Sequence, residues 1–469
     1  MPDTSTLLED KADSTELDLS SSPVWNDTLH TADLWGRFTH LKLLDLNNNG
    51  LTSLPTCLEV LSSLDILFLS ENNFETIPEC IGKMQQLRVL SLRGNLLTTL
   101  SSSNLPSASL VWLILTNNKI ETIDPNVREL VHLRKLMLSH NKLTSIPQEM
   151  GECKSLELIR LANNEINVPL PSEFLTLPKL AWISLAGNSI IQCPPTTHKI
   201  IPKSSVSYDE SNILGRGASG TVFLGNHNGK EVAVKVFKQE SMGSDGTAAD
   251  EAAINGLVNH PLAVTADGIY ISDDGDSFTH EGMVMELIKD AEALGKVPSF
   301  QTVTRDAGPS DSAQDMSREQ VLSVVWNVAS CLEHIHSSVR VVNGDIYLHN
   351  ILLCGDGIAK VSDWGASFVY DDKDDSAVNC FEAIEVLAFG RLVQDLFDWH
   401  LGTALPDLTE PADFLGRSRG EMLGAGKLFD LMSSILQPRQ CERPTFSIIK
   451  TKLSAMPEFA FCAGTPNHD

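Results

Sequence analysis

Two polar residues that could carry out phosphoryl-transfer chemistry lie in the stretch "VNGDIYLHNILL", residues 342–353. Asp345 precedes Asn350 by five positions, and a hydrophobic run follows. A carboxylate can accept the proton of an attacking hydroxyl, and an amide oxygen can ligate a divalent cation. This spacing is the one that phosphoryl-transfer sites use for one base and one metal ligand. We therefore take Asp345 and Asn350 as the starting point for the chemistry of this chain.

A second group of residues upstream could hold phosphate groups. In "ILGRGASGTVFLGNHNGKEVAVKVF", Gly215, Gly217 and Gly220 form a G-x-G-x-x-G pattern. A dinucleotide-binding fold uses the same glycines between a strand and a helix, whereas here they lie between two alternating apolar stretches. The pattern therefore predicts a hairpin whose backbone amides fold over phosphates. Lys235, fifteen residues after Gly220 on a predicted buried strand, needs an anionic partner because an unpaired interior charge is costly.

Further motifs occur in a fixed order over residues 208–455. They are "DEAAINGLVNHP" with Glu251, "GMVMELI" with Met285, "KVSDWGAS" with Asp363, and "QCERPTF" with Arg443. Together with the glycines, Lys235, Asp345 and Asn350, this set resembles the protein kinase signature. The resemblance implies a bilobal α+β protein-kinase-like domain that uses ATP and Mg²⁺.

The resemblance also implies a role for each matched residue. Glu251 would pair with Lys235 and hold it against the α- and β-phosphates, and Asp345 would take the proton of the attacking hydroxyl. Asn350 and Asp363 would hold magnesium, with Trp364 replacing the Phe that usually follows the Asp. The adenine would lie against Leu214, Val222, Ala233 and Leu352, beside the gatekeeper Met285 and the backbones of Glu286 and Ile288.

The segment around the predicted base departs from the family pattern. Asn343-Gly344 replaces His-Arg before Asp345, and without that Arg we expect no switch by phosphorylation of the activation segment. The segment is short, since 22 residues separate Asp363 from Glu385, which we expect to begin the next helix. No A-P-E sequence is visible, and Glu382 is the candidate to replace its glutamate as the partner of Arg443.

The predicted catalytic loop also lacks its usual lysine. Tyr347 lies two residues after Asp345, where most serine/threonine kinases have the Lys that neutralises the γ-phosphate. Tyrosine kinases place a cation two or four residues after this Asp, and His349 occupies the second position. His349 could act as that cation if protonated, or it could only pack and form hydrogen bonds. The loss of one such cation could lower the rate by ~10²–10³, which would slow an enzyme without abolishing turnover.

The first half of the chain is a repeat array. Asn49, Asn72, Asn95, Asn118, Asn141, Asn164 and Asn188 recur every 23 residues, with one interval of 24. Each ends a phrase of the type L-x-x-L-x-L-x-x-N-x-L, such as "LRKLMLSHNKL" at residues 133–143. This array resembles the leucine-rich repeat family, which implies an α/β solenoid with a parallel sheet on its inner face. We expect each Asn amide to be buried at a turn, where it satisfies backbone groups of adjacent repeats.

The non-leucine positions of the predicted strands should face outward on the concave side. One column reads Asp45, Phe68, Ser91, Ile114, Met137, Arg160 and Ser184, and Trp112 and Trp182 occupy an adjacent column. Apolar residues gathered on such a face often mark a protein-binding site. We therefore predict partner binding by Phe68, Trp112, Ile114, Met137 and Trp182. The alternative is that the flanking tail or the second domain covers them.

Composition limits the classes of function. The net charge of −26 falls mainly on the two ends of the chain, with about −7 in residues 1–36 and about −19 in residues 201–469. Such a charge disfavours nucleic acid and anionic lipid as partners, and weakly favours basic substrates. The chain has no run of eighteen apolar residues, so we expect no membrane span. The nine scattered cysteines form no C-x-x-C pair, which favours reduced thiols and a cytoplasmic location.

The sequence thus predicts several domains with distinct roles. They are an acidic, disordered tail (1–36), about seven leucine-rich repeats (37–193), a linker (194–207), a protein-kinase-like domain (208–455) and a C-terminal tail (456–469). We expect a serine/threonine kinase whose repeats bind a protein partner or substrate. The loop form G-D-x-Y-x-H-N resembles that of microbial leucine-rich-repeat kinases. The alternatives are a nucleotide-binding pseudokinase that acts as a scaffold, and a kinase that acts on a small molecule. The polar insertion at 299–319 has no interpretation from sequence.

Overall fold

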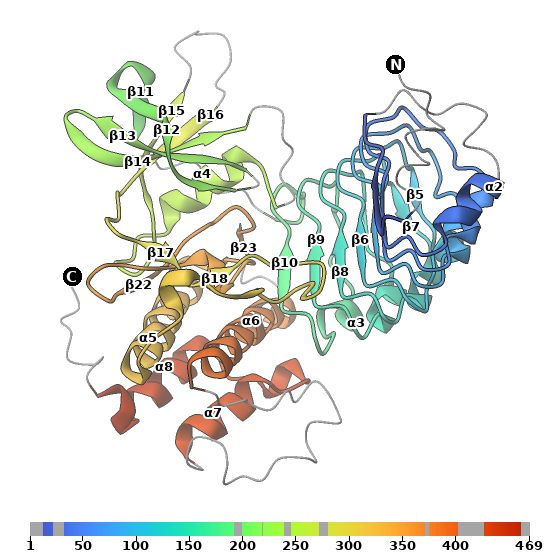
Figure 1. Ribbon diagram of the computed structural model, residues 1–469. Coiled ribbons are helices and arrows are strands. Elements are labelled where there is room, and N and C mark those ends of the chain that lie inside the picture. The colour runs from blue at the N-terminus through green and yellow to red at the C-terminus, as the bar shows by residue number, and fades with distance from the viewer. Residues whose placement is uncertain are drawn as a thin grey trace. The chain divides into compact units, whose positions relative to one another are not determined.

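The fold consists of two compact units, which we describe separately (Figure 1). The computed structural model describes residues 13–21, 32–191, 199–217, 219–238, 245–271, 280–370, 375–401 and 426–460. The first unit is Met1–Leu177 and the second is Pro178–Asp469. The division places the last predicted repeat strand in the second unit, whereas the sequence predicts the boundary in the linker 194–207.

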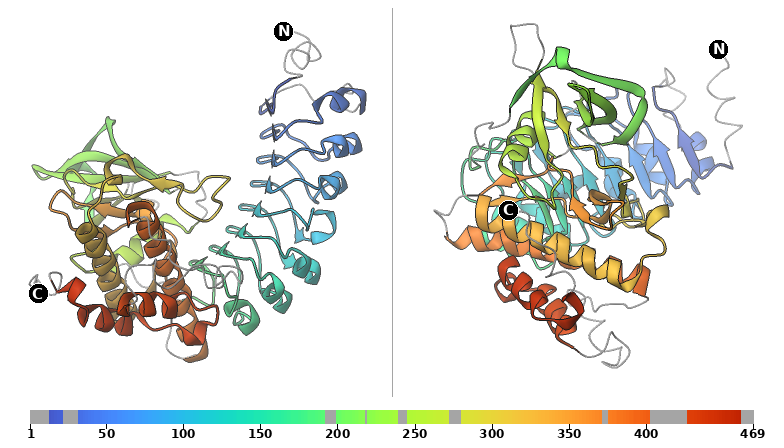
Figure 2. Two further views of the ribbon diagram at one scale, coloured as in Figure 1. Left: turned by 60° about the horizontal axis from the view of Figure 1, so that its bottom comes forward. Right: turned by 90° about the vertical axis from the view of Figure 1, so that its left-hand side faces the viewer.

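The first unit is a stack of repeats, each of which contributes one short strand to a parallel sheet (Figure 2). The main strands are β1 (Glu16–Asp18), β2 (Leu43–Asp45), β3 (Ile66–Phe68), β4 (Val89–Ser91), β6 (Trp112–Ile114), β8 (Lys135–Met137) and β9 (Leu158–Arg160). A small second sheet pairs β5 (Thr99–Leu100) with β7 (Thr122–Ile123). Residues from Asp45 to Arg160 in the predicted column lie side by side in register, which confirms the predicted solenoid.

The repeated asparagines hold neighbouring repeats together. The Asn72 amide donates to the carbonyls of Leu46 and Leu69, at 3.0 Å each, and its oxygen accepts from the Leu51 amide at 2.9 Å. Asn95, Asn118, Asn141 and Asn164 form the same bonds one repeat further along each time. The buried amide therefore satisfies turn carbonyls that would otherwise lack partners, as the sequence predicts.

The prediction that residues 1–36 form a disordered tail is wrong for the described part of that segment. Strand β1 pairs in parallel with β2, so that Glu16, Leu17 and Asp18 extend the repeat sheet. A short helix, α2 (Ala32–Trp35), follows, and Trp35 packs on Phe38 with ring centroids 6.0 Å apart. Leu17 and Trp35 are fully buried, so these residues cover the apolar end of the repeat stack.

The second unit contains an N-terminal lobe built on a six-stranded sheet in the order β11-β15-β16-β14-β13-β12. Its strands are β11 (Ile200–Pro202), β12 (Val206–Arg216), β13 (Gly220–His227), β14 (Lys230–Phe237), β15 (Ala266–Ile271) and β16 (His280–Met285). Helix α4 (Ala248–Leu257) packs on this sheet and begins with a capping box between Thr247 and Asp250. Part of the predicted linker is therefore structured, because β11 and the start of β12 belong to the sheet.

The C-terminal lobe is mainly helical. Its helices are α5 (Arg318–His334), α6 (Asp375–Leu401), α7 (Lys427–Ile435) and α8 (Phe446–Ser454). Short strands lie before α5 and between α5 and α6: β17 (Glu292–Ala293), β18 (Gly295–Lys296), β19 (Gly308–Pro309), β20 (Val341–Val342), β21 (Ile351–Leu353), β22 (Ala359–Val361) and β23 (Phe368–Val369). Helix α3 (Ser172–Leu175) is the last helix of the repeats. The repeat strand that follows it, β10 (Trp182–Ser184), belongs to the second unit. Within the described residues, none of the helices is both long and apolar enough to cross a bilayer.

A half-buried histidine predicts acid sensitivity of the second unit. His260, after α4, stacks on His334 of α5 with centroids 4.9 Å apart, and Lys450 and Glu333 are also nearby. Burial, together with the charges of His334 and Lys450, lowers the pKa of His260 to about 4. Between pH 6.5 and 4 the unfolded state binds more protons, so folding stability falls as the pH falls. Solvent screens the partly exposed ring, so we expect a loss of about 1–2 kcal/mol.

The measurement is urea unfolding at pH 7.5 and pH 5 for wild type and His260→Gln. The His260 variant should lose less stability on acidification than wild type. His132→Gln, which changes an exposed histidine in the repeats, serves as the control and should behave as wild type. Equal acid sensitivity in all three proteins would contradict the assignment to His260.

Candidate active site

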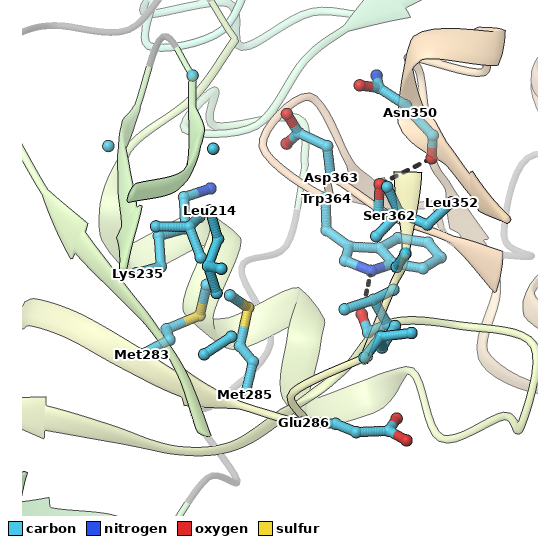
Figure 3. Close-up of a pocket in the computed structure, with 18 of the residues that line it drawn as sticks. Leu214, Lys235, Met283, Met285, Glu286, Asn350, Leu352, Ser362, Asp363 and Trp364 are labelled. Carbon is cyan, nitrogen blue, oxygen red and sulfur yellow. Dashed lines mark hydrogen bonds between the residues drawn. The ribbon is translucent and has the colours of Figure 1, made fainter. Parts of the chain in front are cut away.

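A cleft of about 300 Å³ in the second unit gathers most of the predicted site (Figure 3). Lys235, Met283 and Met285 lie on the N-terminal lobe side, and Asp363, Asn350 and Leu352 lie on the other. All the predicted nucleotide-binding residues line it: Leu214, Gly215, Gly217, Gly220, Val222, Ala233, Lys235, Glu286, Ile288 and Leu352. Glu251 and the two predicted metal ligands, Asn350 and Asp363, also line it. The structure therefore brings together residues that are spread over 150 positions of the sequence.

The cleft contains a buried ion pair between β14 and α4, two elements of the N-terminal lobe. The Lys235 ammonium donates to Glu251 Oε1, and the side chains are only 9% and 3% exposed. Burial alone would lower the pKa of Lys235, but the carboxylates of Glu251 and Asp363 raise it above its ordinary value. Lys235 is therefore held as a cation in the cleft, where it can meet a phosphate group.

The glycine-rich segment is the hairpin that the sequence predicts. Strands β12 and β13 pair in antiparallel fashion, and the Gly217 amide donates to the Gly220 carbonyl at 2.9 Å. Gly220 is required by packing, since a Cβ there would lie 2.5 Å from the Val236 carbonyl oxygen. A Cβ on Gly215 would meet nothing within 4 Å, so the space over the cleft is open at that point. Such an open, amide-lined turn can accommodate phosphate oxygens.

The predicted base is hydrogen-bonded to one of the predicted metal ligands. The Asn350 amide donates to Asp345 Oδ2 at 3.0 Å and to the Asp345 carbonyl at 2.9 Å. Asn343 joins both ends of the site, because its oxygen accepts from the Asp345 amide and its nitrogen donates to the Asp363 carbonyl. These bonds fix the loop 343–350 relative to Asp363. The sequence gives no role to Asn343, which replaces a histidine of the family pattern.

Asp363 has a left-handed backbone with φ of 58°. This conformation is uncommon outside glycine, although Asp and Asn tolerate it, and it is often found at functional sites. The following residue, Trp364, is buried, and its indole N–H donates to the Val264 carbonyl at 2.9 Å. The indole N–H of the tryptophan therefore has a hydrogen-bond partner at a position where the family pattern has Phe.

Comparison with known proteins agrees with this geometry. Residues 208–388 match the family model described as protein kinase domain, and residues 39–97 and 131–190 match leucine rich repeat. The chain combines leucine-rich repeats with a protein kinase domain. Its N-lobe sheet and helical C-lobe are those predicted from the sequence.

The related proteins are distant kinases. Wall-associated receptor kinase-like 21 of Arabidopsis thaliana is 30% identical over 42% of this chain and 29% of its own length. The tyrosine-protein kinase csk-1 of Caenorhabditis elegans is 26% identical over 50% of the chain and 42% of its own length. A Dictyostelium discoideum protein named probable serine/threonine-protein kinase is 28% identical over 37% of the chain and 12% of its own length. The chain thus matches less than half the length of each of these relatives.

In the kinase domain, the residue at the usual lysine position does not face the cleft. Tyr347 is 4% exposed, and the ring of His349 lies 4.9 Å from its ring. His349 Nδ1 lies 2.5 Å from Asp306 Oδ1, and Asp306 Oδ2 accepts from the Leu348 amide at 2.8 Å. Asp306 lies in the insertion 299–319, so one role of this insertion is to hold the catalytic loop at Leu348 and His349. Its polar composition was the only sequence signal, and it did not indicate this contact.

The charge state of His349 follows from its neighbours. Burial alone would lower the pKa of His349, but the hydrogen bond and charge of Asp306 raise it above its ordinary value, with help from Asp345 and Asp363. His349 is therefore packed and hydrogen-bonded, and its surroundings also favour the cation. Both properties that the sequence left open as alternatives are present together.

A buried hydrogen-bond network connects the catalytic loop to α6. Glu385 Oε1 accepts from the Gly344 amide at 2.7 Å, and Glu385 Oε2 lies 2.6 Å from His336 Nε2. The other nitrogen of His336 lies 2.8 Å from the Tyr370 hydroxyl. Glu385 lies inside α6, which begins at Asp375, so the prediction that it begins the helix is wrong. The sequence prediction placed the start of the helix at the apolar run after Glu385, and so it missed the turns of α6 that precede this run.

Arg443 also differs from its prediction. It donates to the carbonyls of Gln437, Ala383 and Pro178, and Glu382 instead accepts from the Phe446 amide. Glu382 is therefore not the partner of Arg443 in this structure. The three carbonyls accept hydrogen bonds from the guanidinium, so Arg443 has hydrogen-bond partners without an A-P-E glutamate.

The predicted partner residues do not share one environment. Phe68, Trp112, Ile114 and Met137 are half-buried in the repeat sheet, and Lys135 Nζ lies 4.0 Å from the Trp112 ring. Trp182 is 2% exposed and packs on the catalytic loop, so its assignment to an exposed partner surface is wrong. For Trp182 the alternative reading is correct, because the catalytic loop of the kinase domain covers its side chain.

Proposed function

We propose that the protein is an ATP- and Mg²⁺-dependent kinase that transfers the γ-phosphate to serine or threonine hydroxyls. The observation that carries this proposal is the convergence of Lys235, Glu251, Asn350 and Asp363 in one cleft, with Asp345 hydrogen-bonded to Asn350 beside it. Decay of an unused site would not be expected to preserve a buried charge pair together with a hydrogen-bonded base and ligand set. Burial of an ion pair has a desolvation cost, and such a pair in a cleft is typical of a functional site.

The residues of the cleft fit the nucleotide and the metal ion. Lys235 would bind phosphate oxygens, the open hairpin would cover them, and Val222, Ala233 and Leu352 would enclose the base. The oxygens of Asn350 and Asp363 are ligands that Mg²⁺ prefers, and this ion supplies positive charge against the transferred phosphoryl group when bound. Asp345 would orient the acceptor hydroxyl and accept its proton at a carboxylate oxygen, and Asn350 holds that carboxylate in place.

The finer parts of the proposal concern the acceptor, the partner of the repeats and the location. Serine/threonine specificity is supported by the name of the Dictyostelium relative, whereas another relative is named a tyrosine kinase. The half-buried apolar side chains of the repeats support a protein partner or substrate there. A cytoplasmic location is supported by the seven free thiols among the described residues.

A nucleotide-binding scaffold without turnover is the second candidate. The observation that favours it is the burial of Tyr347 outside the cleft, since this position then supplies no cation for the γ-phosphate. An ATP site that binds without transferring would still order the kinase domain and could present the repeats to a partner. Turnover measurements on wild type separate the two candidates.

The test of the proposed site is Lys235→Met. We expect this change to lower ATP turnover by ~10²-fold or more, because one phosphate-binding cation is lost. It should also destabilise the domain by roughly 3 kcal/mol, because Glu251 is left buried without its partner. Turnover of radiolabelled ATP, binding of a fluorescent ATP analogue and urea unfolding measure the three effects.

The double variant Lys235→Met/Glu251→Gln separates stability from function. Removing the unpaired carboxylate should restore much of the lost stability, while turnover stays low. If the double variant also recovers turnover, Lys235 has only a structural role and the proposed nucleotide site is incorrect. Wild type that binds the analogue with Mg²⁺ but shows no turnover would favour the scaffold.

A further inference from the structure

The last repeat strand, β10, contacts the catalytic loop through Trp182. The Trp182 and Tyr347 rings are stacked, with centroids 4.6 Å apart and planes inclined by 5°. The indole N–H donates to the Ile346 carbonyl at 3.0 Å. Both rings are almost fully buried, so the contact combines apolar burial, ring stacking and a satisfied polar group. A residue of the repeats therefore fixes the backbone and a side chain directly after the predicted base, Asp345.

The backbone of β10 also approaches the loop at Gly344. This glycine has φ of 75°, and a Cβ placed on it would lie 2.5 Å from the Ile183 carbonyl oxygen and 3.0 Å from that of Ala366. No real Cβ can be this close to a backbone oxygen, so a side chain at residue 344 is incompatible with β10 in this position. The missing arginine of the family pattern is thus explained by the repeat strand that occupies its place.

The chain that leads into β10 is held as well. Arg443 donates one guanidinium hydrogen bond to Pro178 O at 3.0 Å and another to Ala383 O in α6 at 2.8 Å. The opposite side of the loop is held by Asp306, which accepts from the Leu348 amide and contacts His349. The loop 344–350 therefore lies between two anchors, one from the last repeat and one from the insertion after the hinge.

We infer that β10 is a working part of the kinase domain and that Trp182 is a positioning residue, which holds the loop so that Asp345 and Asn350 keep their productive geometry. Gly344 and Tyr347, the two departures from the family pattern, are the loop's side of this contact. The role presupposes the proposed phosphotransfer activity. It replaces the usual arginine–phosphate contact with a permanent one, so that the loop is ordered by the last repeat and not by phosphorylation.

The test compares Trp182→Ala, Trp182→Phe and Trp326→Ala. Trp326 lies in α5, where it packs on Phe459, so its replacement makes an equal change in side-chain size elsewhere in the domain. The readouts are amide hydrogen exchange of residues 343–350, kcat and KM for ATP, and the thermal midpoint. All variants are made in the full chain.

Trp182→Ala should increase exchange in the loop about tenfold or more, because the stacking partner and the bond to Ile346 are lost. It should lower kcat by ~10–100-fold with KM for ATP within about twofold, because the ATP-binding residues lie outside the contact. Trp182→Phe keeps a ring on Tyr347 and should recover most of both effects. Trp326→Ala should leave exchange in the loop unchanged, whatever its effect on the thermal midpoint.

Unchanged loop exchange in Trp182→Ala would overturn the inference, as would equal loss of kcat in Trp182→Ala and Trp326→Ala. Absence of turnover in wild type would refute the proposed function and, with it, the catalytic role of Trp182. In that event the exchange data still decide whether β10 holds the loop, so the two failures can be told apart.

Discussion

Replacing Asp345 by Asn is expected to lower phosphoryl transfer by ~10²–10⁴ while leaving the fold intact. Asparagine has nearly the same shape as aspartate but cannot accept the proton of the attacking hydroxyl. The hydrogen bond from Asn350 to the Asp345 carbonyl does not depend on the side chain, so the loop should keep its conformation. The measurement is transfer from radiolabelled ATP with Mg²⁺ to a generic basic protein, for wild type and variant.

Nucleotide binding provides the control for this substitution. Asp345 does not line the cleft that contains the predicted adenine- and phosphate-binding residues, so affinity for an ATP analogue should change by less than about threefold. A variant that keeps the wild-type rate would show that Asp345 is not the base. Binding by both proteins without transfer by either would favour the scaffold, with the altered catalytic loop as the reason.

Local patterns in the sequence were sufficient for the repeats and for the nucleotide cleft. The asparagines recur at one period, and each forms bonds within its own turn and to residues of the preceding repeat 21 to 26 positions away, so the pattern repeats in space as it does in sequence. The glycines and Lys235 lie on adjacent strands of one hairpin and its neighbour, where pairing brings them together directly. Such contacts depend on few other elements, which is why residue spacing predicts them well.

The surroundings of the catalytic loop could not be predicted in this way. Trp182 meets the loop across 164 positions, and Asp306 meets Leu348 across 42, so each contact depends on how whole elements pack. In sequence, Trp182 fits the column of outward-facing strand residues, and its periodic position suggested exposure. The same alternation that predicts which face a side chain occupies cannot tell whether another element covers that face.

Similarly, sequence could show that Gly344 and Tyr347 depart from the family pattern but not why. Read alone, the two changes indicate loss of a phosphate contact and of a transition-state cation, which favours a weakened enzyme. In the structure, β10 lies against Gly344 and Trp182 stacks on Tyr347, so one contact that orders the loop accounts for both residues. A glycine chosen for a close backbone approach is physically different from one that results from loss of constraint.

Replacing Gly344 by Ala is therefore expected to be strongly destabilising. Adopting positive φ costs a residue with a Cβ about 1 kcal/mol. The new methyl group would also overlap the Ile183 carbonyl, and the relaxation of such an overlap costs about 1–3 kcal/mol. We expect a total loss of about 2–4 kcal/mol in urea unfolding, together with faster amide exchange in residues 343–350 as β10 is pushed away.

Gly357 provides a matched control for this effect, because it also has positive φ, of 84°, but has nothing within 4 Å of its Cβ position. Gly357→Ala carries the conformational cost without the overlap, so it should lose only about 1 kcal/mol. The difference between the two variants measures the approach of β10 to the loop. Equal losses in stability would mean that Ile183 does not lie against Gly344, and the arginine of the family pattern would then be missing for another reason. A larger loss in Gly344→Ala, accompanied by a lower kcat, would show that the last repeat and the catalytic loop are fitted to each other.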